Sequence, residues 1–323
     1  MGILQYADGR KNFYDGVGTM VNAKDISEVL QASELDYTVR KEQLYFENGT
    51  PAKDVFATVR DTKDGPQVLG HVGKQYTILQ NIDAFNFLTD VVRTGELEVV
   101  NAGCVDNGKR AYICAKTEPF KVLDDDIDPY IVFMNSFDGC GSVRVMFTPV
   151  RVFCSNCEVL ATKKAKRAVS VKHSRQVVDN LYIAGGILLQ NTEYLNAYKE
   201  EMEQLATMRV TRQKFAENIV PALLKHMGLM DEAGEAKERK RDPNVMYRYR
   251  DELLNCWSKA DLANYENTAY NVFQAISDWE THYSPLKNKN NGEIYFERAV
   301  KGMVFTNWVL NYMKNSGILV SAR

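Results

Sequence analysis

The sequence changes character near residue 165, and this change constrains the fold more than any other feature. Before it, short segments rich in Val, Ile, Phe, Tyr and Thr alternate with Gly, Asp and Asn turns. After it, apolar residues recur at helical spacing. Alternating segments between turns indicate a sheet, whereas a period of 3.6 indicates helices. We therefore expect an α+β protein, with a mixed, mostly antiparallel sheet and a few helices over residues 1–165 and a helical domain over residues 166–323.

Turn signals place the expected elements of the first part. Asp61–Pro66 contains Asp-Gly and Asp106–Lys109 contains Asn-Gly, and both dipeptides are typical of β-hairpin turns. The acidic run at 124–126 is expected to be a solvated loop. The predicted strands are 36–46, 53–60, 67–72, 96–105, 110–117, 130–135 and 143–154, and the predicted helices are 23–31 and 81–92.

The second part is expected to be helical throughout. Residues 231–243, DEAGEAKERKRDP, mix charges of both signs around a glycine and end in proline, so we expect a mobile charged loop there. The predicted helices are 169–190, 192–208, 212–227, 243–257, 261–283 and 293–315.

Composition excludes several classes of protein. Hydrophobic residues make up 45% of the chain, with 17 tyrosines and 14 phenylalanines, which excludes dominant disorder. No apolar run approaches the roughly 18 residues of a membrane span, and the N-terminus lacks a signal-peptide layout. Six cysteines are too few for a disulfide scaffold. We expect a cytoplasmic protein without membrane contact.

One local cluster of charge departs from the net charge of −2. Between residues 144 and 175 the chain has eight Lys or Arg residues and one acid, Glu158. Such a run can follow a phosphate backbone. It can also be a solvated helix face, or pair with acids such as the chain's own 124–128 run. We name this set, with the histidine inside it, the basic stripe: Arg144, Arg151, Lys163, Lys164, Lys166, Arg167, Lys172, His173 and Arg175.

Aromatic residues near the basic stripe offer base-stacking platforms in principle. Phe133, Phe147 and Phe153 have alternating strand spacing, which is more typical of core residues, whereas Phe137 lies in a turn and is expected to be exposed. Residues 247–250, Tyr-Arg-Tyr-Arg, interleave rings and cations. They form either a second nucleic-acid patch or a helix with one buried face.

Catalytic and metal-binding motifs give no positive signal. Cys154 and Cys157 have the spacing of a zinc half-site, but no second pair completes it. Phosphate-binding loops, nucleophile elbows, His-Glu-x-x-His and dinucleotide fingerprints do not occur. We therefore predict no metal and no cofactor, and the question of an enzyme stays open because carboxylates that cluster only in space cannot be seen in a sequence.

A tight polar turn precedes the last predicted strand of the sheet. Asn135, Ser136, Asp138 and Gly139 can satisfy their own backbone there, or they can form a binding loop beside the basic strand that follows.

Four blocks together carry a family resemblance. They are G-H-V-G-K-Q-Y-T-I-L-Q-N-I-D-A-F at 70–85, N-S-F-D-G-C-G-S at 135–142, T-P-V-R-V-F-C-S-N-C-E at 148–158 and K-H-S-R at 172–175. In this order they resemble the phage/plasmid-like protein family built on domain of unknown function 932. The resemblance implies a protein of a mobile genetic element, often encoded near recombination or anti-restriction genes, with no catalytic residues to carry over. Some relatives have glycine where this chain has Cys157, which argues further against zinc.

These observations lead to two functional hypotheses. The first is non-enzymatic nucleic-acid binding, with single-stranded DNA favoured, in replication, recombination or annealing; the basic stripe would bind phosphates, the polar turn would shape the adjoining loop, and a homo-oligomer would be compatible. The alternative is an anti-restriction or anti-defence protein that blocks a host protein, with the acidic run as its contact surface.

Overall fold

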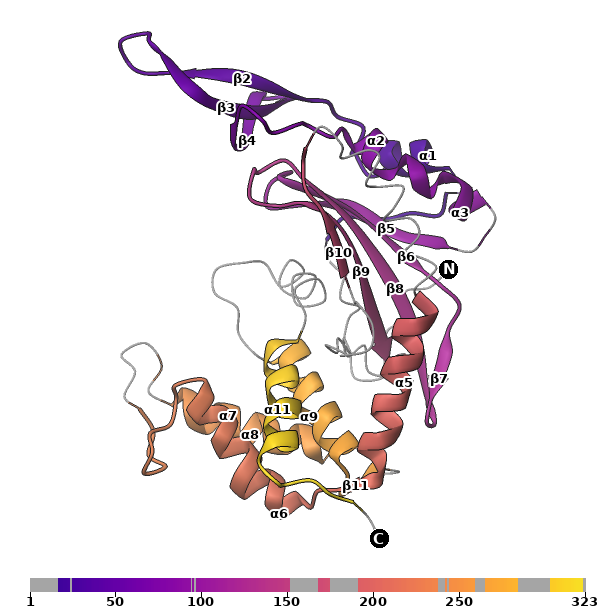
Figure 1. Cartoon of the computed structure of the whole chain (residues 1–323), viewed down its shortest axis with the longest axis vertical. Coiled ribbons are helices and arrows are strands. Elements are labelled where there is room, and N and C mark those ends of the chain that lie inside the picture. Colours follow the sequence, from indigo (N-terminus) through magenta and orange to yellow (C-terminus); the bar gives the residue numbers. More distant parts are fainter. Residues whose placement is uncertain are drawn as a thin grey trace.

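A computed structural model describes most of the chain. The described residues are 17–23, 25–93, 95, 97–151, 168–174, 191–237, 242, 244–258, 265–283 and 303–321. Figure 1 shows antiparallel sheets formed by the N-terminal half and a group of helices formed by the C-terminal half. The expected α+β class is therefore confirmed.

The main sheet is antiparallel at every described pairing. A tight turn joins two of its strands at residues 106–109. Asp106, Asn107 and Gly108 all have positive φ there, as the Asn-Gly signal predicts. Its strand order is β1 (Thr19–Met20), β5 (Glu98–Val105), β6 (Arg110–Lys116), β8 (Asp125–Ser136), β9 (Val143–Arg151) and β10 (Ala168–Val171), and β7 (Phe120–Val122) also pairs with β8.

Short helices cover one face of this sheet. Asp25 caps the first of them by accepting a hydrogen bond from the Ser27 amide at 2.8 Å. Val29, Phe85 and Leu88 of these helices pack against sheet residues such as Phe133 and form a buried apolar cluster. The helical elements are α1 (Ile26–Ala32), α2 (Asn81–Phe85), a 3-10 turn (Asn86–Leu88) and α3 (Thr89–Arg93).

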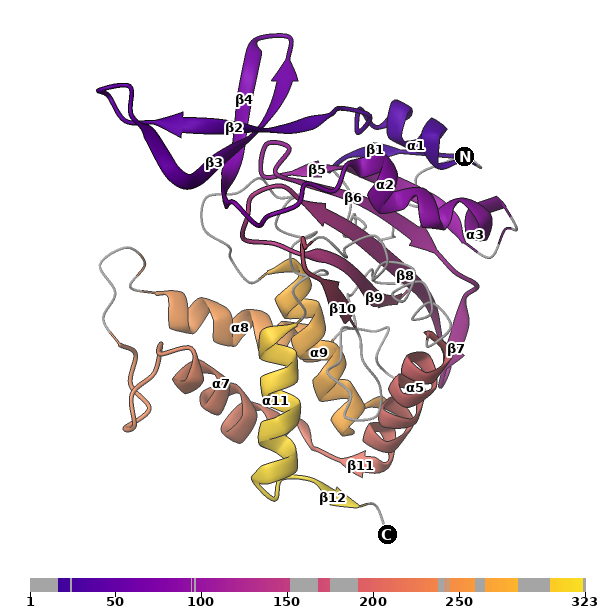
Figure 2. The same ribbon diagram turned by 45° about the horizontal axis from the view of Figure 1, so that its top comes forward.

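A second sheet projects from the main one, and we call it the arm (Figure 2). Its base is fixed by a small apolar cluster in which Val39 and Leu69 pack against Phe137 of the main sheet's β8–β9 loop. The three antiparallel strands of the arm, in order, are β2 (Val39–Tyr45), β3 (Pro51–Thr62) and β4 (Gly65–Gly73).

The helical part is organised around one fully buried helix, α9. Phe273, Ile276 and Trp279 of α9 are completely inaccessible to solvent. Val122 and Ile127, from the β7–β8 hairpin, belong to the same apolar cluster. The described elements are α5 (Asn191–Thr207), β11 (Met208–Arg209), α6 (Arg212–Lys214), a π-helical turn (Phe215–Ile219), α7 (Val220–His226), α8 (Val245–Trp257), α9 (Ala269–His282), α11 (Val304–Asn315) and β12 (Val320–Ser321).

Two expectations about local structure were wrong. Residues 168–171, expected to begin a helix, form strand β10, because Val171 and its neighbours pair with β9 and complete the sheet. The acidic run was expected to be a loop, but β8 already begins at Asp125, where it pairs with Val122 of β7. The rest of the predicted helix 169–190, from residue 175, lies outside the described residues, as do residues 238–241 and 243 of the predicted loop 231–243.

No helix in the described part of the chain is long and apolar enough to cross a membrane.

Candidate functional site

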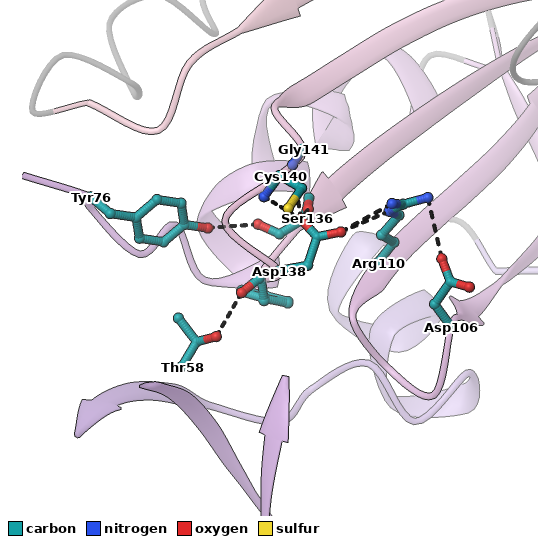
Figure 3. Close-up of polar contacts among 9 residues, drawn as sticks. Thr58, Tyr76, Asp106, Arg110, Ser136, Asp138, Cys140 and Gly141 are labelled. Atoms are coloured by element: carbon teal, nitrogen blue, oxygen red, sulfur yellow. Dashed lines mark hydrogen bonds and ion pairs between the residues drawn. The ribbon is translucent and has the colours of Figure 1, made fainter. Parts of the chain in front are cut away.

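The polar turn between β8 and β9, residues 135–141, is held together by one carboxylate (Figure 3). One oxygen of Asp138 accepts hydrogen bonds from Ser136 Oγ at 2.7 Å and from the amides of Cys140 and Gly141, both at 2.8 Å. The other oxygen lies 3.1 Å from both Nε and Nη2 of Arg110. We call these residues the motif loop.

Electrostatics at Asp138 favour the ionised form. Burial of the side chain raises the pKa of the carboxyl, but the hydrogen bonds from Ser136, Cys140 and Gly141 and the charge of Arg110 outweigh it, so the pKa is lowered overall. Arg110 also contacts Asp106 at 3.2 Å and thereby ties the motif loop to the β5–β6 turn. The carboxylate is thus fully engaged within the protein.

Asn135 anchors the motif loop from below. Its side chain is completely buried, and Nδ2 donates to the Leu79 carbonyl at 2.9 Å and to Asn81 Oδ1 at 3.1 Å. Asn81 in turn donates to the Leu35 carbonyl at 2.9 Å. These bonds link the sheet to the segment that leads into α2.

The arm and the segment that follows it donate hydrogen bonds to backbone carbonyls of the motif loop. Thr58 Oγ1 donates to the Phe137 carbonyl at 2.6 Å, and Tyr76 OH donates to the Ser136 carbonyl at 2.8 Å. Phe137 itself has no exposed surface, so the expectation that it would be exposed was wrong. Its ring fills the base of the arm, which a local turn pattern cannot reveal.

Two glycines permit this close approach. A side chain at Gly70 of β4 would place its Cβ 2.5 Å from Cα of Asp138. Gly139 has φ of +75°, and a Cβ there would lie 2.5 Å from the His71 carbonyl oxygen. The arm and the motif loop therefore pack backbone against backbone.

His173, just after β10, completes the same assembly. Its ring stacks on Tyr76 with centroids 4.8 Å apart, and its carbonyl accepts a hydrogen bond from the Thr77 amide at 3.3 Å. The residue is 8% exposed, and neither ring nitrogen has a hydrogen-bond partner within the described parts of the chain. Burial lowers the pKa of the imidazole, although Thr77 and Asp138 oppose this shift. His173 is therefore a neutral, buried ring at this point.

The structure places only part of the basic stripe. Arg144 of β9 pairs in register with Ser170 of the edge strand β10, and Lys172 follows that strand directly. Arg144 is half-buried and Lys172 is exposed, and neither forms an ion pair with another described residue. For Arg151 the backbone is described and the side chain is not. Lys163, Lys164, Lys166, Arg167 and Arg175 lie outside the described residues, as do Phe153, Cys154 and Cys157.

The charged side chains of the acidic run bind to neighbouring side chains of the protein. The same holds for the arginines of residues 247–250, which we call the Tyr-Arg patch. Asp126 and Asp128 pair with Lys121 and Lys116 at 3.0 and 2.8 Å, and Asp124 accepts a hydrogen bond from the Tyr265 hydroxyl at 2.8 Å. In the Tyr-Arg patch, Arg248 pairs with Asp242 at 2.8 Å and Arg250 with Asp251 at 3.1 Å, while Tyr249 is buried and Tyr247 is 43% exposed. This is the pattern of a helix with one buried face.

Phe133 and Phe147 are buried core residues, as their spacing predicts. Within the described part of the chain, no group of three or more His, Cys, Asp or Glu side chains could hold a metal ion.

Four residues of this assembly were not predicted as site residues: Thr58, Tyr76, Asp106 and Arg110. A weak signal existed for Tyr76, because it belongs to the 70–85 block. The others come from strands and turns whose proximity depends on how the arm and the sheet pack.

The assembly joins three of the four blocks that carry the family resemblance, 70–85, 135–142 and 172–175. Residues 68–301 match the family model described as Domain of unknown function (DUF932). The chain belongs to this family. No curated protein and no solved structure matches the chain. The description of the family assigns no activity to the junction.

Proposed function

We propose that this DUF932 protein binds nucleic acid without catalysing a reaction, with single-stranded DNA as its ligand, in replication, recombination or annealing on a mobile genetic element. The Lys and Arg residues of the basic stripe form the proposed phosphate-binding surface, and His173, which is buried, is not part of it. Phosphate contacts dominate the affinity of such proteins and need cations whose charge is not already neutralised.

One observation carries this proposal: Arg144 and Lys172 of the stripe have no acidic partner among the described residues. Lys116 and Lys121 of the same sheet are instead each paired with an aspartate. Arg144 lies on β9, beside the edge strand β10, and Lys172 directly follows β10, so only Lys172 lies at the edge of the sheet. In the sequence, four further cations at 163–167 come directly before this strand.

The alternative hypothesis of a host-protein blocker receives less support. It relied on the acidic run as a contact surface, but Asp124, Asp126 and Asp128 are bonded to Tyr265, Lys121 and Lys116. A partner would have to compete with these internal contacts.

The test is fluorescence anisotropy of labelled single- and double-stranded oligonucleotides at several salt concentrations. We expect single strands to bind more tightly, and each neutralised phosphate to contribute about −0.7 to the slope of log affinity against log salt concentration. Changing the four cations at 163–167 to Glu should weaken binding at least about tenfold and flatten this slope. The substitutions are Lys163→Glu, Lys164→Glu, Lys166→Glu and Arg167→Glu.

A charge-matched control separates the stripe from an effect of net charge. It reverses four exposed lysines elsewhere and should bind as the unmodified protein does. Equal loss of affinity in both variants, or no binding at low salt, contradicts the proposal. The control substitutions are Lys53→Glu, Lys63→Glu, Lys121→Glu and Lys199→Glu.

A further inference from the structure

A groove of about 470 Å³ opens on the helical part, away from the motif loop. Pro221, Lys225 and His226 of α7 form one side, and Trp308 and Tyr312 of α11 form the other. His226 is exposed, and Trp308 and Tyr312 are partly exposed. Aromatic side chains that remain in contact with solvent around a hollow are typical of a binding site.

Three rings of this groove form a continuous stack. The centroids of His226 and Trp308 lie 4.3 Å apart with planes 12° from parallel, and those of Trp308 and Tyr312 lie 5.3 Å apart at 8°. In an aromatic cage that binds a cation, the rings face the cation from several sides. The rings of this groove are parallel to one another, an arrangement that suits a flat ring added to the end of the stack. His226 is the solvent-exposed end of the stack, and no further ring lies beyond it in the described part of the chain.

Polar groups border the stack. The π-helical turn before α7 places Asn218 at the groove, and its amide has no hydrogen-bond partner within the described residues. Turns of this kind are rare and often occur at functional sites, and an Asn amide can pair with the edge of a base. Lys225 Nζ donates a hydrogen bond to the Glu232 carbonyl at 3.3 Å and lies 3.5 Å from Glu232 Oε2, and the Lys225 side chain is 35% exposed.

We propose that this groove binds a nucleobase of a single-stranded nucleic acid, which stacks on His226 and extends the ring stack. Asn218 contacts the base edge, and Lys225 contacts the adjoining phosphate. This inference rests on the proposed function, and it adds a base-stacking site that is separate from the basic stripe.

Tryptophan fluorescence tests the site directly, because the chain has three tryptophans and only Trp308 is accessible. Trp257 is 4% exposed and Trp279 is fully buried. We expect oligothymidylate to quench the fluorescence, and an abasic strand of equal length to leave it unchanged. Trp308→Phe should remove the quenching and keep the affinity, because it keeps a ring in the stack.

His226→Ala removes the ring on which the base would stack. Since His226 is exposed, the variant should fold normally, as circular dichroism can verify, and bind single strands about 5- to 150-fold more weakly by anisotropy. Tyr247→Ala is the matched control: it removes an aromatic ring of similar setting on α8, 43% exposed and next to an arginine, and should leave affinity unchanged.

The outcomes distinguish this site from the proposed function itself. If oligonucleotides bind by anisotropy but neither quench Trp308 nor depend on His226, the base site is wrong and the phosphate-binding stripe stands. If thymidine monophosphate quenches Trp308 as tightly as the oligonucleotide does, the groove is a site for free nucleotides and the assignment to a strand is overturned. If no oligonucleotide binds at all, both proposals fail.

Discussion

The motif loop and the α7–α11 groove use their chemical groups in opposite ways. In the motif loop, each oxygen of Asp138 already has protein partners, and Asn135 is buried and bonded to Leu79 and Asn81. In the groove, His226 is exposed and the amide of Asn218 is unused within the described residues. A ligand gains most where groups are not yet paired, since a bond that is already made has to be broken first. The most recognisable residues of the chain therefore build the fold, and the less distinctive ones are available for binding.

The strongest test of the structural role of the motif loop is Asp138→Ala. The substitution removes one of the two carboxylates that pair with Arg110 and leaves two backbone amides without their acceptor, at a side chain that is only 10% exposed. We expect the free energy of unfolding to fall by about 3 kcal/mol, as chemical denaturation would measure. Asp126→Ala, at a more exposed ion pair, should cost less than about 1 kcal/mol. Equal losses would mean that the motif loop is not a special structural element.

Gly70→Ala should have the next largest effect. The new methyl group would overlap the backbone of Asp138, which cannot move without disturbing its bonds, so we expect a loss of about 2 kcal/mol in the same measurement. Gly73→Ala is the matched control, because it lies in the same strand with nothing within 4 Å of the added carbon. A Gly70 variant as stable as the Gly73 variant would show that the arm does not press on the motif loop.

A smaller effect is expected from the pH dependence of stability. Burial lowers the pKa of His173, so below about pH 6.5 the unfolded chain binds a proton that the folded protein resists. The neutral His173 ring makes its full contribution to the free energy of unfolding above this pH, and the contribution is lost as the pH falls toward the lowered pKa. His173→Phe, which keeps a ring against Tyr76, should flatten the slope of unfolding free energy between about pH 7 and pH 5. A slope that His173→Phe does not change would exclude this explanation.

The smallest effect on stability is expected at the basic stripe. Lys172→Glu changes an exposed residue that pairs with no acid among the described residues, so the free energy of unfolding should change by no more than about 0.5 kcal/mol. The same variant should nevertheless weaken single-strand binding, measured by anisotropy at low salt. A variant that loses stability and keeps binding would show that Lys172 supports the fold and does not bind the strand.

Much of the fold follows from local signals. The Asn-Gly turn at 107–108, the strands on either side of it and the start of α2 at Asn81 were predicted where the structure has them. Each depends on backbone preferences within a few residues, which a sequence displays directly.

The candidate site was harder to predict, because its contacts join distant segments. Burial of Phe137 depends on Val39 and Leu69, and the partner of Asp138 is an arginine 28 residues away. Strand β10 is four residues long and is defined by pairing with β9, so the sequence around it gave too little periodicity to separate strand from helix. The self-satisfying turn at 135–139 was one of the two interpretations that the sequence left open, and the structure supports it.

The bonds that fasten the arm to the motif loop also have a kinetic consequence. Thr58 reaches the Phe137 carbonyl across 79 positions of the chain, and Tyr76 reaches Ser136 across 60. Closing such long loops is slow, because their entropy is lost before the contacts that compensate for it have formed. During synthesis, the arm strands can pair with one another long before residue 137 exists. The arm is therefore expected to form early as an unattached hairpin unit and to dock late, when the β8–β9 turn finally reaches it.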